Sequence, residues 1–153
     1  MHEVRQGELV LENTRAIFGL PAATNYVVRV RMCVKELLRL RGTRLPGVGF
    51  RSSQGGGYLL GALPDDKELW LGADYFDADK RHRIGTMVHT ACKFVVGQWY
   101  SLQVEARGTH IQLLVDGRRI IDTQDESFSQ GTVKLLAGNA RVHFDDFSVQ
   151  LLP

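Results

Sequence analysis

Residues 98–152 decide the fold, with the sequence QWYSLQVEARGTHIQLLVDGRRIIDTQDESFSQGTVKLLAGNARVHFDDFSVQLL. Apolar and polar residues alternate along it, as at Leu102, Val104 and Ala106, which is typical of strands with one buried face. Asp116-Gly117 separates two such runs and predicts a two-residue hairpin of type I′. The stretch therefore predicts a half-buried antiparallel sheet, which needs a second layer to pack against.

The rest of the chain continues this pattern of strands and turns. Residues 36–44 contain leucines with loose helical periodicity, but they lack a cap and end at Pro46-Gly47, so we expect a strand followed by a loop. No helix is expected, and the 153 residues are interpreted as a single all-β domain, 1–153. Further strands are predicted at 9–11, 26–35, 48–52, 58–63, 68–76, 84–91 and 94–96.

The last predicted strand contains a change of phase. Val142 and Phe144 fit one alternation, whereas Phe147 and Val149 fit the opposite one. Both pairs reach the core only if an extra residue is inserted between them. The sequence therefore predicts a β-bulge at 145–146.

The predicted bulge places two carboxylates side by side, those of Asp145 and Asp146. One interpretation is a solvated bulge that blunts a sheet edge. The other is a structural Ca²⁺ site, completed by backbone carbonyls and by Glu3 or Glu8. Both interpretations stay open at this point, and no other metal or cofactor is expected.

Composition and charge exclude several kinds of partner. A formal net charge of +2 is too small to indicate a nucleic acid or a membrane surface. No apolar run is long enough to span a bilayer, and no apolar segment follows Met1–Arg5 as a secretory signal requires. Between Arg29 and Arg51, however, seven basic residues stand against one acid. This run is either a solvated surface or a patch for an anionic ligand such as an acidic glycan.

The two cysteines, Cys33 and Cys92, do not match a zinc motif. They are interpreted either as one disulfide or as two free thiols.

Motifs for catalysis are missing from the sequence. Glycoside hydrolysis needs two carboxylates that face each other across a cleft, and no alternating pair of acids lines a predicted strand. The glycine run at 55–57 lacks the lysine and the following helix of a phosphate loop. The histidines are scattered, and none stands in an HExxH motif: His2, His82, His89, His110 and His143. The sequence therefore leans towards a protein that is not an enzyme.

One predicted strand offers candidates for ligand binding. In 68–76, Leu69 and Leu71 take the core phase, which turns Trp70 and Asp74 outward. Exposure of an indole ring to water is unfavourable. An outward tryptophan therefore either contacts a ligand, meets another chain or lies under a loop. An aromatic ring with polar neighbours is what a sugar site requires.

Six motifs follow one another along the chain: Val48-Gly49-Phe50-Arg51, Tyr58-Leu59-Leu60, Gly97-Gln98-Trp99-Tyr100, Val115-Asp116-Gly117, Gly131-Thr132-Val133 and Val142–Val149. Together they resemble the concanavalin A-like lectin/glucanase superfamily, over about residues 8–152. The nearest members are laminin-G-like and family-16-like, including the 3-keto-disaccharide hydrolase-type domain. The resemblance implies a jelly-roll sandwich with one concave and one convex sheet, sugar binding on the concave side, and in some members a structural Ca²⁺. The family-16 catalytic motif, two Glu flanking an Asp on one strand, is absent.

We therefore expect an all-β, two-sheet antiparallel jelly-roll sandwich of the concanavalin A type that binds carbohydrate or a related polar ligand without catalysis. The expected ligand-binding residues are Trp70, Arg51 and Asp74, with Arg29 and Arg31 on a neighbouring strand. Two alternatives remain. One is a glycoside-hydrolase-like enzyme with an unconventional site, and the other is a structural or protein-interaction module that forms a homodimer.

Overall fold

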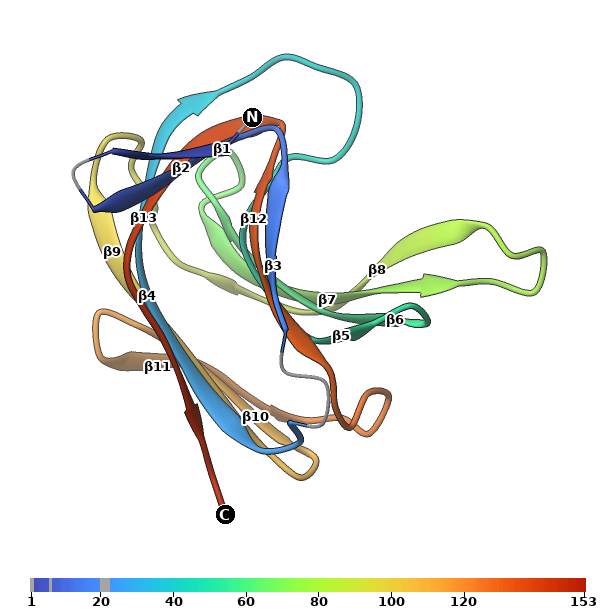
Figure 1. Ribbon diagram of the computed structural model, residues 1–153. Helices are drawn as coiled ribbons and strands as arrows, with labels where there is room; N and C mark the ends of the chain where they lie inside the picture. The colour runs from blue at the N-terminus through green and yellow to red at the C-terminus, as the bar shows by residue number, and fades with distance from the viewer. Residues whose placement is uncertain (1, 6, 20–22) are drawn as a thin grey trace.

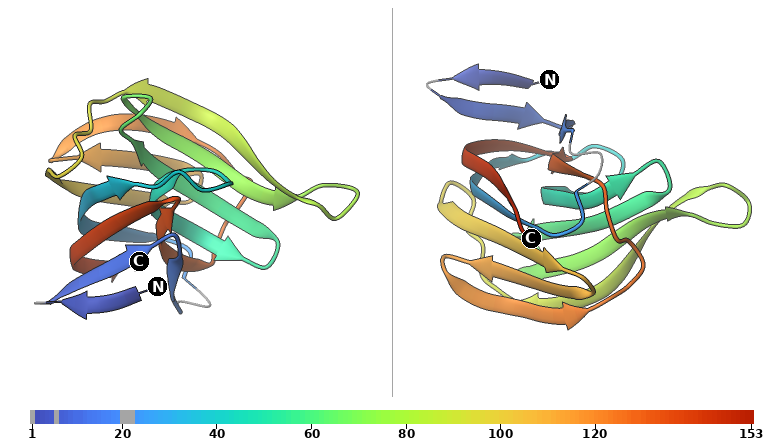
Figure 2. Two further views of the ribbon diagram at one scale, coloured as in Figure 1. Left: turned by 90° about the horizontal axis from the view of Figure 1, so that it is seen from above. Right: turned by 60° about the horizontal axis from the view of Figure 1, so that its bottom comes forward.

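Thirteen strands in two antiparallel sheets form the part of the chain that the computed structural model describes, residues 2–5, 7–19 and 23–153 (Figure 1). The seven-stranded sheet has the order β1-β2-β13-β4-β9-β10-β11, and the six-stranded sheet has the order β3-β12-β5-β6-β7-β8. Figure 2 shows the two layers facing each other. The expected all-β sandwich is confirmed. The strands are β1 (His2–Arg5), β2 (Glu8–Glu12), β3 (Arg15–Phe18), β4 (Tyr26–Leu37), β5 (Leu45–Ser53), β6 (Gly56–Leu63), β7 (Glu68–Phe76), β8 (His82–Ala91), β9 (Trp99–Arg107), β10 (His110–Val115), β11 (Arg118–Gln124), β12 (Thr132–Gly138) and β13 (Ala140–Leu151).

The core lies between the sheets, and the predicted alternation supplies it. Leu102, Val104 and Ala106 are all at most 2% exposed. Asp116 and Gly117 have φ angles of 50° and 79°, and the strands that they join pair in antiparallel register. Positive φ at both central residues is the requirement of a type I′ turn, so this prediction is confirmed.

The phase change in β13 is resolved by the predicted bulge. The register between β13 and β4 shifts between Asp145 and Ser148, and Asp146 has a φ of 50°. As a result Phe144 is buried on one side of the bulge, while Phe147 and Val149 pack against the same core on the other.

Residues 94–96 do not form the predicted strand. They lie in a turn that the Gln98 N–H closes on the Val95 carbonyl, and Gly97 has a φ of 90°. Phe94 is buried edge-on against Tyr100, with ring centroids 5.0 Å apart. The apolar composition of residues 94–96 therefore reflects the burial of the Phe94 ring and not the hydrogen-bonded pairing of a strand.

Cys33 and Cys92 are free thiols, which settles the alternative left open by the sequence. Burial raises the pKa of both thiols. Among the described residues, no helix is long and apolar enough to cross a membrane.

Candidate functional site

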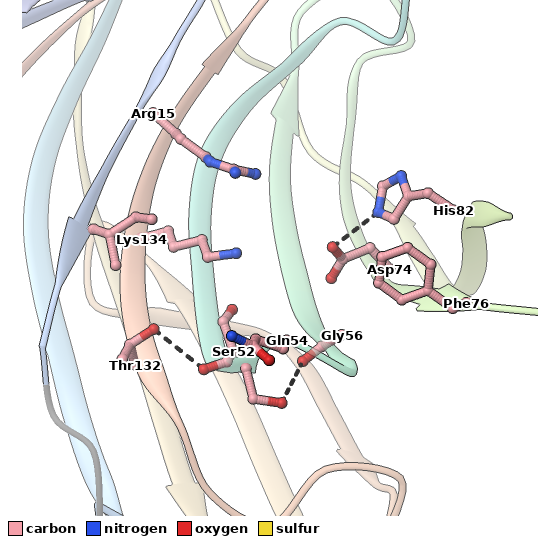
Figure 3. A pocket seen from close by; sticks show the side chains of 11 residues that line it. Arg15, Ser52, Gln54, Gly56, Asp74, Phe76, His82, Thr132 and Lys134 are labelled. Carbon is pink, nitrogen blue, oxygen red and sulfur yellow. Dashed lines mark hydrogen bonds and ion pairs between the residues drawn. The ribbon is translucent and has the colours of Figure 1, made fainter. Parts of the chain in front are cut away.

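The outer face of the six-stranded sheet is hollowed. Arg15 on β3 and His82 on β8 line one cavity, although these strands are the two edges of the sheet. Opposite edges share a cavity only if the sheet is curved with its concave side outward, and the ribbon bends in this way between β12 and β8 (Figure 1). The cavity has a volume of about 490 Å³. Figure 3 shows its lining, and we call it the Asp74 hollow.

The β7–β8 hairpin forms one wall of the Asp74 hollow. Phe76 pairs with His82 across the hairpin, so both stand on the same face as Asp74. The Oδ2 atom of Asp74 lies 3.0 Å from Nε2 of His82. The ring of Phe76 is 5.5 Å from the imidazole, and this residue is 51% exposed.

The second oxygen of Asp74 lacks a partner in the part of the chain that the structure describes. Its Oδ1 atom is buried, and no described residue donates a hydrogen bond to it. The hydroxyl of Ser52, which lines the same hollow, is also buried without a partner among the described residues. Buried polar atoms are nearly always paired in folded proteins, and an unpaired one calls for a ligand, a water or a functional role.

A bulge that the sequence analysis missed sets the direction of Ser52. The register between β5 and β6 shifts between Phe50 and Ser53, and Arg51 has a φ of 47°. Phe50 and Arg51 both turn inward as a result, and Ser52 takes the outward position. Bulges re-aim side chains in this manner.

Arg15 and Lys134 form the opposite wall of the Asp74 hollow (Figure 3). Burial lowers the pKa of Lys134, and the positive charge of Arg15 lowers it further, while Asp74 opposes this effect. No described carboxylate lies within 4.0 Å of either cation. The hollow therefore combines a carboxylate–imidazole pair with two cations and an exposed aromatic ring.

The predicted outward orientation of Arg51 is wrong. Its side chain is only 1% exposed, and the guanidinium donates hydrogen bonds of 2.7–3.2 Å to the carbonyls of Thr24, Gly108 and Phe128. The backbone N–H of Arg51 donates to the hydroxyl of Tyr26 at 2.6 Å. Arg51 therefore ties three loops together inside the protein and lies out of reach of a surface ligand.

Trp70 does face away from the main core, as predicted, but other side chains cover it. It is 8% exposed and packs with Leu45 and Leu136 in a second apolar cluster. Its Nε1–H donates to Thr86 Oγ1 at 2.9 Å. A Cβ atom at Gly72 would lie 2.2 Å from the indole, so the glycine is what lets the ring lie flat on the sheet. Trp70 is therefore covered, but by side chains of neighbouring strands rather than by the loop that was one of the three expectations.

Arg29 and Arg31 lie elsewhere, on the outer face of the seven-stranded sheet. Arg29 donates to Gln150 Oε1 at 3.0 Å. Arg31 lies 3.7 Å from Asp146 and 5.0 Å from the ring centroid of Trp99. The basic run of the sequence is thus dispersed over the seven-stranded sheet, the loop at 38–44 and the interior.

The carboxylates of the predicted calcium site do not gather further ligands. Asp145 accepts a hydrogen bond from the backbone N–H of Asp146, and Glu8 is paired with His143 at 2.8 Å. The side chain of Glu3 lies outside the described residues. No group of three His, Cys, Asp or Glu side chains that could hold a metal occurs in the described part of the chain. A Ca²⁺ at this bulge stays a prediction without a ligand set.

Of the predicted binding residues, only Asp74 lines the hollow, and the other main lining residues were not expected. They are Arg15, Ser52, Phe76, His82 and Lys134. The hairpin offered a usable signal, because a polar loop at 77–81 between two alternating runs places Phe76 opposite His82 and on the face of Asp74. The residues from β3, β5 and β12 gave no such signal, because their proximity depends on the strand order.

Comparison with protein families gives one match. A model of the family described as the 3-keto-alpha-glucoside-1,2-lyase-like domain matches residues 23–150. No curated protein sequence matches the chain.

Comparison with solved structures identifies the same fold in several proteins. The carbohydrate-binding module CBM66 from Bacillus subtilis is 16% identical with a TM-score of 0.76, over 98% of this chain and 91% of that one. The galectin LEC-6 from Caenorhabditis elegans is 14% identical with a TM-score of 0.64, over 94% and 96% of the two chains. Domain 4 of the arabinanase AbnA from Geobacillus stearothermophilus, solved with arabinotriose, is 12% identical with a TM-score of 0.68, over 98% and 74%. At these identities the likeness shows the fold, which is the concanavalin A-like sandwich that the sequence motifs resembled.

Proposed function

The chain belongs to the family of 3-keto-alpha-glucoside-1,2-lyase-like domains, and from this membership and the geometry of the outer face we propose that it binds a saccharide in the Asp74 hollow. The observation that carries the proposal is the pair of buried, unpartnered polar atoms there, Asp74 Oδ1 and Ser52 Oγ. A sugar presents hydroxyl groups that both donate and accept, so it can satisfy a carboxylate oxygen and a serine hydroxyl together.

The exposed ring beside these atoms supports a sugar over other polar ligands. Phe76 is 51% exposed at the rim of the hollow. The apolar C–H face of a pyranose packs on such a ring, while the hydroxyls at the sugar's edge reach the polar groups. Two proteins of the same fold add weight to this proposal, since one is named as a carbohydrate-binding module and the other was solved with arabinotriose.

The experiment is a calorimetric titration with neutral and acidic glycans, first selected on a glycan array. Asp74→Asn keeps the shape of the side chain and removes its charge. Hydrogen bonds to charged groups contribute about 1.5–3 kcal/mol, so we expect an affinity loss of roughly 10- to 100-fold. Asp146→Asn is the matched control, because this carboxylate is exposed on the other sheet. Equal affinities of the two variants, or no binding to any glycan, would refute the proposal.

A second candidate function is an elimination reaction, favoured by the 3.0 Å contact between Asp74 and His82. A 1,2-lyase acting on a 3-keto glucoside needs a base for the proton at carbon 2, which the adjacent ketone acidifies. A carboxylate–imidazole pair is a suitable general base, and the cations of Arg15 and Lys134 would stabilise the enolate that forms.

Incubation with a 3-keto disaccharide distinguishes the two functions. Elimination breaks the bond between carbon 1 and the glycosidic oxygen and leaves a double bond between carbons 1 and 2 of the keto sugar. Release of the free leaving sugar together with this unsaturated product, both abolished in His82→Gln, would establish the elimination. Binding without release, at protein concentrations near that of the substrate, would leave the protein as a saccharide-binding module.

A further inference from the structure

The two walls of the Asp74 hollow differ in charge. Arg15 on β3 and Lys134 on β12 extend from one wall towards the carboxylate and imidazole of the other (Figure 3). Arg15 and Ile17 alternate outward on β3, and Lys134 lies opposite Ile17 on β12. The placement of both cations is therefore fixed by strand register rather than by a flexible loop.

These cations differ from six of the described surface arginines, each of which has a carboxylate within 4.0 Å. Arg15 and Lys134 lie within 4.0 Å of no acidic group among the described residues, although Arg15 is close enough to lower the pKa of Lys134 by repulsion. Bringing two like charges together in a half-buried hollow is unfavourable unless an anion balances them. Arginines with a carboxylate within 4.0 Å are Arg31, Arg44, Arg83, Arg107, Arg119 and Arg141.

The carboxylate of Asp74 on the opposite wall balances these charges only in part, although it raises the pKa of Lys134 by attraction. Asp74 already contacts His82 through Oδ2, 3.0 Å away. One carboxylate against two cations leaves the hollow with a formal excess of one positive charge, with histidine counted as neutral.

We propose that Arg15 and Lys134 form an anion subsite, which makes the Asp74 hollow selective for saccharides that carry a carboxylate or a sulfate group. This inference rests on the proposed saccharide site. Asp74 accepts hydroxyls on its wall and repels an anion, so the acidic group is oriented towards Arg15 and Lys134. A planar guanidinium binds carboxylate and sulfate oxygens in a bidentate manner, and the ammonium adds a second donor.

The test measures affinities by calorimetry for three oligosaccharides of equal length: an oligogalacturonate, its neutral galactose counterpart and a sulfated galactose oligomer. We expect the wild-type protein to bind at least one acidic ligand about 10-fold or more tightly than the neutral one. The preference should fall to about 2-fold or less in Arg15→Gln/Lys134→Gln. It should persist in the control Arg29→Gln, because Arg29 lies on the other sheet. The carboxylated and sulfated arms identify which anion the subsite takes.

Salt provides a measurement that needs no variant. Raising NaCl from 50 to 500 mM should lower the affinity for the acidic ligands several-fold, because salt screens the ionic contacts. The affinity for the neutral ligand should stay nearly unchanged. An equal affinity for acidic and neutral ligands, with a neutral affinity that still depends on Asp74, would overturn the anion subsite and leave the saccharide site intact. A preference that survives in the double variant would also overturn it. The absence of binding to all three oligosaccharides, together with silence on the glycan array, would overturn both proposals.

Discussion

Replacement of Arg51 by methionine should destabilise the protein strongly, although no ligand is involved. Methionine replaces the aliphatic stem of the arginine with an unbranched apolar chain and removes the guanidinium. The carbonyls of Thr24, Gly108 and Phe128 then lose their charged donor. A hydrogen bond to a charged group contributes about 1.5–3 kcal/mol, so the loss of these contacts costs at least about 3 kcal/mol even where water partly replaces the donor.

Part of that cost is offset, because the variant no longer holds a cation away from water. We therefore expect a net loss of about 3 kcal/mol in the free energy of unfolding. A typical domain has only about 5–15 kcal/mol in total. For a chain of this length the loss corresponds to a melting temperature lower by roughly 6–12 °C.

Urea denaturation followed by circular dichroism measures this loss. Arg29→Met is the matched control, because Arg29 is exposed and makes one hydrogen bond to a side chain, that of Gln150. It should cost about 0.5 kcal/mol or less. If Arg51→Met is as stable as this control, Arg51 does not hold the three loops together.

Three further predictions concern the two sheets. Gly72→Ala should lower the free energy of unfolding by about 1–3 kcal/mol, because its Cβ would lie 2.2 Å from the ring of Trp70. The control Gly85→Ala, whose Cβ would meet its nearest neighbour at 3.5 Å, should lower it clearly less when both are measured by urea denaturation. Iodide should quench the fluorescence of Trp99 more than that of Trp70, which is 8% exposed, when each is measured with the other replaced by phenylalanine; the reverse order would contradict the covered position of Trp70. Burial raises the pKa of Tyr58 to about 12, so above pH 10 the unfolded chain releases a proton that the folded chain retains. Stability should therefore be full below pH 10 and fall between pH 10 and 12 in urea titrations, and this fall should be shallower in Tyr58→Phe; an unchanged slope would contradict the shift.

The fold was readable from the sequence because its signals are local. Alternation fixes the face of each side chain in β9, and the Asp116-Gly117 turn fixes one hairpin. The bulge in β13 was predictable because large apolar residues stand on both sides of it. The bulge at Arg51 was not, because the residues after it, Ser52 and Ser53, are small and polar and show no phase.

The site was less readable because it depends on contacts between distant strands. The alternation in 68–76 predicted that Trp70 faces outward. It could not show that Leu136, which comes from β12, covers the ring. Arg15 and Lys134 line the same hollow because β3 pairs with β12. The local sequence of neither strand indicates this pairing. Asp74 was found because its own strand determines its direction.

The location of the saccharide site can be tested by an NMR titration of the isotope-labelled protein with the saccharide that binds most tightly on the array. We expect the largest shifts of backbone amides to fall on Ser52, Asp74, His82 and Lys134 and to saturate together. Shifts concentrated around Arg29 and Arg31 on the opposite sheet would contradict this expectation, because the ligand would then bind away from the Asp74 hollow.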